Sequence, residues 1–294
     1  GHLSAQFVPN VSGTSSIFGL CLMMLSVVFS SMQTLFVRIL HTHYSSFELA
    51  FSRGFVQLVL SFLWILFTPK LSFWGPPSSR IWLVLRGLAG FIGMSCLYYS
   101  LHLLPLGDTT VIFFTAPLIT AILAALLLKE PISVYEICAG ILCLFGVFLM
   151  TNPFHKQHLN IIIQTNDRFL GVCSGLCAAL AVAIAYILVR KMGASVDFKV
   201  NVFYFALIST LLSPIGMKLS GSNFNIHSLL PQKTFEWIVL FGIGTVGFIG
   251  NALLTLGLQQ CEAGPATLMR FLEVPSSFIL GIIFLHEIPN TVTI

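Results

Sequence analysis

Residues 108–128 read DTTVIFFTAPLITAILAALLL, and no charged side chain follows Asp108 within them. A helix needs about 20 mainly apolar residues to cross a bilayer, so this run predicts a transmembrane helix. The rest of the chain is similar, because its 294 residues are 56% hydrophobic and only 8% charged. A soluble domain carries about 25% charged residues. The composition therefore predicts an integral, multi-pass protein of the lipid bilayer, and it excludes disordered and nucleic-acid-binding chains.

Eight further runs have a similar length and composition, which gives nine predicted spans. They lie at 17–38, 47–67, 81–104, 108–128, 131–150, 169–190, 198–217, 235–258 and 265–285. Strands of membrane barrels are about 10 residues long with alternating polarity, which these runs lack. Since backbone within lipid must satisfy its own hydrogen bonds, we predict an all-α bundle. No feature distinguishes the plasma membrane from the endoplasmic reticulum or Golgi.

Similar segments recur at a nearly constant distance along the chain. Trp82–Gly87 resembles Trp237–Gly242, and Leu128-Lys129-Glu130 resembles Leu285-His286-Glu287. Such spacing predicts a duplicated unit. The predicted organisation is an N-terminal tail at 1–16, a first five-helix repeat at 17–150, a linker loop at 151–168 and a second repeat at 169–294. The second repeat holds four helices and the start of a fifth, so we expect the tenth helix to be missing from this sequence.

A unit of five spans begins and ends on opposite sides of the membrane, so its copy must be inverted. Inverted repeats are the architecture of many secondary transporters. With a cytoplasmic N-terminus, seven cations lie inside, namely Lys70, Arg80, Arg86, Lys129, Arg190, Lys191 and Lys199. Five then lie outside, namely Arg38, Lys156, Arg168, Lys218 and Lys233. This excess predicts a cytoplasmic N-terminus.

Three charged residues fall inside predicted spans, where a charge is costly and usually marks a site or pathway. Arg270 and Glu273 are three residues apart, so they share one face of a helix. The alternative for them is an ion pair that only neutralises itself. Arg53 lies near the predicted start of its helix. It is therefore either a second site residue or an anchor that reaches the membrane surface.

Two prolines interrupt predicted spans at equivalent places in the two halves, Pro117 and Pro275. Paired interruptions of this kind are the best sequence pointer to a binding site at the membrane midplane. We therefore predict a site there, with both prolines as hinges. The alternative is a kink without a function.

Other polar side chains within the spans are candidates for the same site, or for hydrogen bonds between helices. They are Gln33, Tyr98, Tyr99, Thr115 and Asn251. The glycines of Gly242–Gly247 lie in an apolar run and predict close helix packing. No zinc-protease, phosphate-loop or serine–histidine motif occurs, so we expect neither an enzyme nor a bound metal or cofactor.

Two motifs carry a family resemblance: Leu106-Gly107-Asp108-Thr109-Thr110 to Leu128-Lys129-Glu130, and Glu262-Ala263-Gly264-Pro265 with the basic and acidic pair after it. They resemble the EamA-type drug/metabolite transporter superfamily, and within it most nearly solute carrier family 35, subgroup G. The resemblance implies two inverted five-helix repeats and a central cavity that includes Tyr186. It also implies a secondary transporter of a small polar organic anion, such as the di- or tricarboxylate citrate.

The resemblance also leaves alternatives and partners to consider. Relatives carry nucleotide sugars or amino acids, and a membrane interaction protein without transport is a further reading. A coupling proton or counter-substrate and an oligomer are both compatible with the family. For the site, we expect Arg270 to bind a substrate carboxylate, with Asn251 and Tyr99 orienting it and Arg53 adding positive charge. Glu273 would hold Arg270 or carry a proton.

Overall fold

The structure is a computed structural model that describes residues 13–285. The gaps in this range are 41–43, 45, 70, 105, 132–133, 135–136, 139, 143, 146–164 and 220–232. Every regular element in the described part is helical, which confirms the all-α prediction. The predicted span 131–150 lies largely outside the described residues, as does the end of the chain after Leu285.

Six long helices form most of the bundle. They are α1 (Gly13–Leu40), α2 (Ser46–Leu66), α3 (Arg80–Leu103), α7 (Thr165–Met192), α8 (Phe198–Leu219) and α10 (Thr234–Gln260). Their ends agree with the predicted spans to within a few residues. By length and composition, seven stretches of the described chain can cross a membrane, the seventh being Thr109–Leu128. The protein is an integral, multi-pass membrane protein.

Two of the predicted spans are broken helices. The first consists of α4 (Leu106–Phe113), α5 (Ala116–Leu123) and a π-helical turn, Ala124–Leu128; the second consists of α11 (Ala263–Leu268), a 3₁₀ segment, Met269–Leu272, and α12 (Glu273–Leu285). Pro117 and Pro275 lie in the first turns of α5 and α12, where the missing N–H leaves no hydrogen bond unmade. The interruptions therefore fall at the prolines, at equivalent places in the two halves.

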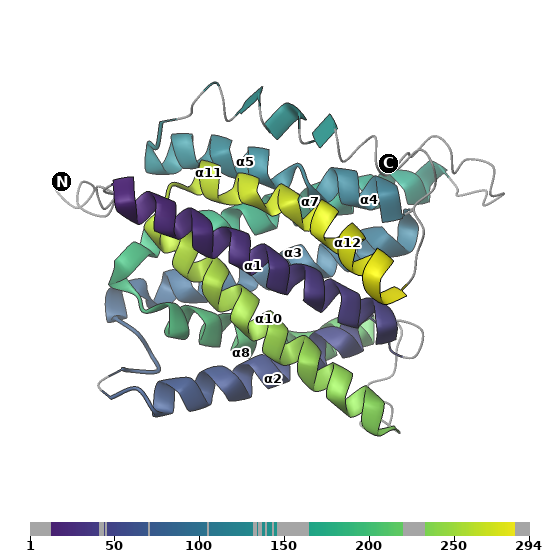
Figure 1. Ribbon diagram of the computed structural model, residues 1–294, viewed down its shortest axis with the longest axis horizontal. Helices are drawn as coiled ribbons and strands as arrows, with labels where there is room; N and C mark the ends of the chain where they lie inside the picture. Colours follow the sequence, from purple (N-terminus) through teal and green to yellow (C-terminus); the bar gives the residue numbers. More distant parts are fainter. Residues whose placement is uncertain are drawn as a thin grey trace.

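Long helices pair across the two halves of the chain. The most extensive contacts join α3 to α7, α1 to α10 and α2 to α8. In Figure 1, α1 runs alongside α10, and the broken helix α11–α12 runs beside α1. The two halves are thus interleaved, and α1 contacts both α10 and the break between α11 and α12.

Close packing against α10 depends on its glycines, as the sequence predicts. A Cβ added to Gly244 would lie 2.3 Å from the Cβ of Val56 on α2. On the same helix, a Cβ at Gly257 would lie 2.7 Å from the Cγ of Met23 on α1. Real Cβ atoms essentially never approach so closely, so the helices would have to separate.

Replacing Gly244 by Ala is therefore expected to lower the free energy of unfolding by about 1–3 kcal/mol, the usual cost of overpacking. Unfolding by SDS in mixed micelles, followed by circular dichroism, measures it. The control is Thr245→Ala on the same helix turn, a half-buried residue whose hydroxyl donates to the carbonyl of Phe241 in its own helix. This change should alter stability by less than about 0.5 kcal/mol. Wild-type stability of the Gly244 variant would contradict the packing described.

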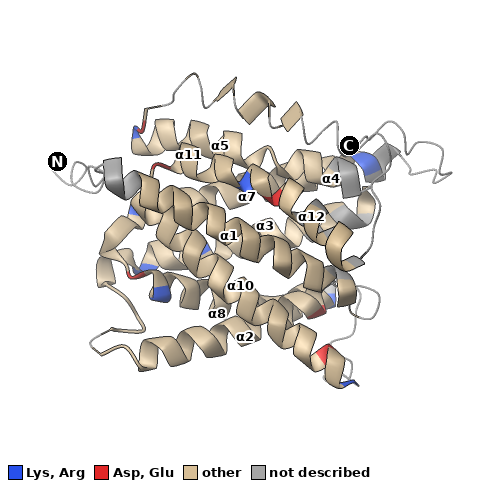
Figure 2. Cartoon of the chain, viewed as in Figure 1, with Lys and Arg blue, Asp and Glu red and all other residues tan. Residues whose placement is uncertain are grey.

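Most charged residues lie toward the ends of the bundle (Figure 2). Arg86 and Arg190 are exceptions, because they lie within α3 and α7 and are only 4% and 3% exposed. The prediction that these two are loop charges is therefore wrong. Without these two residues, five cations remain on the side predicted to be cytoplasmic and five on the opposite side. The loop charges therefore indicate no orientation for the chain in the membrane.

A buried carboxylate lies near each end of α10. At its C-terminal end, Glu130 accepts a hydrogen bond at 2.6 Å from Nε of Arg190, whose Nη1 donates to the carbonyl of Gln259. At its N-terminal end, the hydroxyl of Tyr44 donates to Oε2 of Glu236 at 3.0 Å. Burial and the Glu236 carboxylate raise the pKa of Tyr44 to about 12, so this hydroxyl stays protonated and remains a donor.

Candidate functional site

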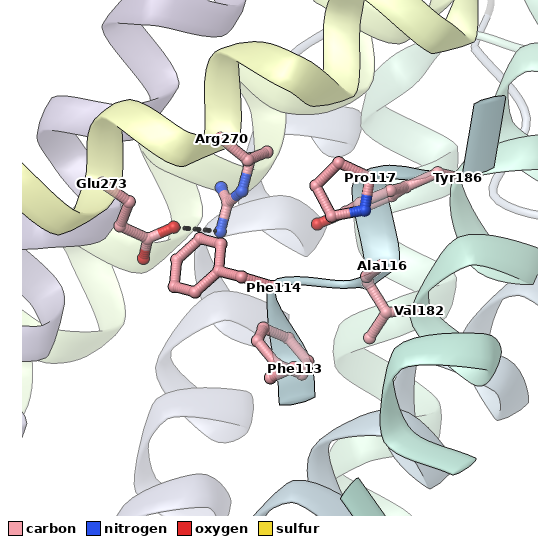
Figure 3. Close-up of a pocket in the computed structure, with 8 residues that line it drawn as sticks. All are labelled: Phe113, Phe114, Ala116, Pro117, Val182, Tyr186, Arg270 and Glu273. Carbon is pink, nitrogen blue, oxygen red and sulfur yellow. Dashed lines mark ion pairs between the residues drawn. The ribbon is translucent and has the colours of Figure 1, made fainter. Parts of the chain in front are cut away.

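A pocket lies where the two broken helices approach α7 (Figure 3). It is lined by Phe113, Phe114, Ala116, Pro117, Val182, Tyr186, Arg270 and Glu273. Figure 3 shows the Arg270 side chain directed between Glu273 on one side and Pro117 and Tyr186 on the other. The pocket therefore lies between the two helix breaks. Arg270 and Glu273 line it from the second break, and Pro117 lines it from the first.

The breaks themselves position the two charges. Arg270 lies on the 3₁₀ segment, and Glu273 is the first residue of α12. A carboxylate in the first turn of a helix is stabilised by the helix dipole. Nη2 of Arg270 and Oε2 of Glu273 are 2.6 Å apart, and Nη1 of Arg270 donates to Oγ of Ser30 on α1 at 3.1 Å. The ion pair is thus held against α1 as well as within its own helix.

The pocket is small and its walls are mostly apolar. The free space at its centre is ≈ 10 Å³, which is about the room that one water molecule needs. Phe114 stacks on Phe271, with ring centroids 5.7 Å apart, across the two breaks. A solute of several carbon atoms can therefore enter only if the surrounding helices move apart. Among the described residues, no three His, Cys, Asp or Glu side chains are placed to hold a metal ion.

A second polar cluster lies among α1, α2, α3, α8 and α10. Arg53 on α2 donates to Sδ of Met94 at 3.6 Å. When the amide of Gln33 on α1 is oriented with its oxygen toward Arg53, Oε1 accepts from Nε and Nη1, both at 3.1 Å. The guanidinium of Arg53 also lies 5.9 Å from the ring centroid of Phe205 on α8. Arg53 is therefore directed into the bundle rather than toward the membrane surface.

Arg86 belongs to the same cluster. Its guanidinium lies 4.4 Å from the ring centroid of Phe205, and its Nη2 donates to Oδ1 of Asn251 on α10 at 3.1 Å. The two arginines thus contact the same aromatic ring. Asn251 is held by a cation of the other half of the chain.

The structure divides the predicted site residues into three groups. Arg270, Glu273 and Pro117 line the pocket, whereas Gln33, Arg53 and Asn251 lie in the second cluster. The remaining ones are not brought to either place. Thr115, which lies in the break between α4 and α5, donates to the carbonyl of Ile112 at the end of α4. Pro275 is exposed on α12, and Tyr99 is 50% exposed. The side chain of Tyr98 lies outside the described residues.

The sequence does not identify several residues of the pocket and of the second polar cluster. Ser30 and Phe205 carry no charge and have no distinguishing neighbours in the sequence, so nothing singles them out. The charge count includes Arg86 among the cytoplasmic cations, although it falls inside the predicted span 81–104. A basic residue within an apolar run was the signal that could have identified it.

Two broken helices that meet beside a partly buried ion pair, within two interleaved halves, define a class of membrane transporter. The chain belongs to the EamA-like transporter family, which matches residues 17–152 and 169–294. The predicted resemblance is thereby confirmed.

Curated relatives agree with this assignment. Human "Solute carrier family 35 member G1" is 30% identical over 279 residues, which cover 94% of this chain and 74% of the relative. The "S-adenosylmethionine uptake transporter" of Rickettsia prowazekii is 27% identical over 94% of this chain and 87% of its own length. A "Probable transport protein" of Saccharomyces cerevisiae is 31% identical over 74% of this chain, and the match spans 64% of that relative. These names describe transport rather than an enzymatic reaction.

Among solved structures, one crystal structure matches this chain with a TM-score of 0.74 at 15% sequence identity. The match covers 95% of this chain and 91% of that one. At this identity the likeness concerns the fold alone.

Proposed function

We propose that the protein is a secondary transporter of a small polar organic anion, of the di- or tricarboxylate class that includes citrate. The observation that carries the proposal is Arg270, an arginine held beside both helix breaks and directed into the pocket. Broken helices are the elements that move or bind solute in transporters with inverted repeats. The choice of carboxylates over other anions rests on the resemblance to solute carrier family 35, subgroup G.

Charge supports an anion over a neutral or cationic solute. Arg270 has the carboxylate of Glu273 beside it, whereas Arg86 donates to the neutral amide of Asn251. The ion pair is neutral overall, so the charge of Arg86 gives the interior around the pocket a net positive charge. The N-terminal residues of α5 and α12, Ala116 and Glu273, both line the pocket. Helix N-termini carry partial positive charge, which also favours an anion.

Individual roles follow from these positions. Arg270 binds a carboxylate of the solute, and Glu273 holds Arg270 until that happens or exchanges a proton when the solute enters. Tyr186 lines the pocket and Tyr99 does not, so we assign the orienting hydroxyl to Tyr186. Because the free space holds about one water molecule, transport requires the two halves to open alternately around this point, with the breaks at Pro117 and Pro275 as flexing points.

A thermal-shift comparison of purified protein tests the substrate class. We expect citrate and succinate to raise the unfolding temperature in a concentration-dependent way, since a ligand at 100 times its Kd stabilises the folded state by about 2.7 kcal/mol. UDP-galactose and leucine serve as comparison compounds from the other metabolite classes. Uptake of labelled citrate into proteoliposomes then separates transport from binding alone. Stabilisation by UDP-galactose or leucine, with none by the carboxylates, would overturn the proposal.

A further inference from the structure

We infer that Arg86 and Asn251 form a second anion-binding position beside the Arg270 pocket, so that the preferred solute carries at least two carboxylate groups. The inference rests on the proposed function and makes it more specific. It assigns a ligand to the second polar cluster. Under the proposed function, Arg270 binds only one carboxylate of the solute.

Unsatisfied donors point to a ligand at this position. Arg86 is 4% exposed, and its Nε has no hydrogen-bond partner among the residues that the structure describes. Nδ2 of Asn251 is likewise buried without a partner, although its Oδ1 accepts from Arg86. Buried polar groups in folded proteins are nearly always hydrogen-bonded. Both unpartnered atoms are N–H donors on two residues that are bonded to each other, and a carboxylate, with two acceptor oxygens, fits such a pair.

Gln57 on α2 adds a third side chain of the same kind. It is 0% exposed, and neither its Nε2 nor its Oε1 has a hydrogen-bond partner among the described residues. A Cβ on Gly247 would lie 2.8 Å from both Nε2 of Gln57 and the end of the Gln33 amide that faces away from Arg53. Gly247 and Asn251 are four residues apart, so they share one face of α10. Gln57 therefore reaches the face of α10 that carries Asn251.

The charge of Arg86 also supports a bound anion at this position. An arginine inside a membrane span normally pairs with a carboxylate or lines a pathway. The partners given for Arg86 in the described part of the chain are the neutral amide of Asn251 and the ring of Phe205. The ring face attracts a cation but carries no net charge. A bound carboxylate would supply the missing negative charge.

Tyr186 connects the two positions. It lines the Arg270 pocket and lies near Arg86 as well. Ser30 on α1 also links the positions, because it accepts from Arg270 and its backbone N lies 3.6 Å from a Cβ placed at Gly250, the neighbour of Asn251. One solute can therefore contact Arg270 with one carboxylate and reach toward Arg86 with another. A monocarboxylate would use only the first of these contacts.

The test compares acetate, succinate and citrate as probes in thermal-shift titrations of wild-type protein and of Arg86→Gln. We expect Arg86→Gln to weaken succinate and citrate binding by about tenfold or more, as expected for the loss of a hydrogen bond to a charged group. Acetate binding should stay within about twofold, because it depends on Arg270 alone. Arg168→Gln, which removes an exposed arginine at the start of α7, should leave all three affinities unchanged.

Should Arg86→Gln fail to fold, Arg86→Lys keeps the charge while removing the forked donors, and it should also weaken the dicarboxylate more than acetate. Wild-type affinity of either folded variant for succinate and citrate would overturn the inference and leave the proposed function standing, with water as the partner of these donors. If none of the three probes stabilises the wild-type protein, the proposed function and this inference both fail.

Discussion

Replacing Glu130 by Ala is expected to lower the free energy of unfolding by about 3–5 kcal/mol, the usual cost of removing one partner of a buried ion pair. The side chains of Arg190 and Glu130 are only 2% and 6% exposed. Oε2 of Glu130 also accepts from the backbone N–H of Ala263, the first residue of α11. The substitution therefore leaves a buried cation and a helix N-terminus without their acceptor.

The matched control is the double variant Glu130→Ala/Arg190→Met, which removes both charges. Apolar replacement of a whole buried pair is often neutral in stability, so the double variant should recover most of the loss. SDS unfolding in mixed micelles measures all three proteins. If the single and double variants lose the same free energy of unfolding, the buried charge of Arg190 does not cause the loss, which would contradict this explanation.

Replacing Arg270 by Gln is expected to reduce uptake of labelled citrate by about 100-fold. Truncating one partner of a buried charge pair costs about 2–5 kcal/mol, and this pair, with side chains 15% and 18% exposed, belongs in the lower part of that range. Part of that loss arises from the uncompensated charge of Glu273. The double variant Arg270→Gln/Glu273→Gln removes this part. If Arg270 contacts the solute, uptake by the double variant should stay low.

Recovery of wild-type uptake by the double variant would mean that Arg270 only neutralises Glu273, which is the alternative reading of this pair. Lys191→Gln is the control, since Lys191 lies over the ring of Trp82, with Nζ 3.8 Å from its centroid, away from both clusters. Surface expression and size-exclusion profiles confirm that each variant folds. Proteoliposome uptake per folded protein is the quantity to compare.

Apolar length and proline position made most of the fold predictable. A run such as 198–217 is long enough to cross a membrane and has no other stable conformation in lipid, so its helix, α8, begins where the sequence predicts. The two prolines marked both helix breaks because proline is tolerated best in the first turn of a helix, although Pro214 lies inside α8 without ending it. The pairing of helices across the two halves could not be predicted, because it depends on glycine contacts such as Gly244 against Val56.

The site was only partly predictable for a related reason. Arg270 and Glu273 are close in sequence, so their pairing follows from helix geometry. Arg86 and Asn251 are bonded across two distant helices, and no spacing rule connects them. Tyr99 illustrates the opposite error, since its hydroxyl suits a site but its side chain is half exposed.

The buried carboxylate of Glu130 joins segments that lie far apart in the sequence, which has a consequence for how the transporter opens. It is held by Arg190 on α7 and by the backbone N–H of Ala263 on α11. A hydrogen bond to a charged group is worth about 1.5–3 kcal/mol, and each 1.4 kcal/mol changes a population about tenfold. A conformation that separates α7 and α11 from Glu130 gives up both contacts. At equilibrium without solute, molecules open at this end of the bundle should therefore be a small minority.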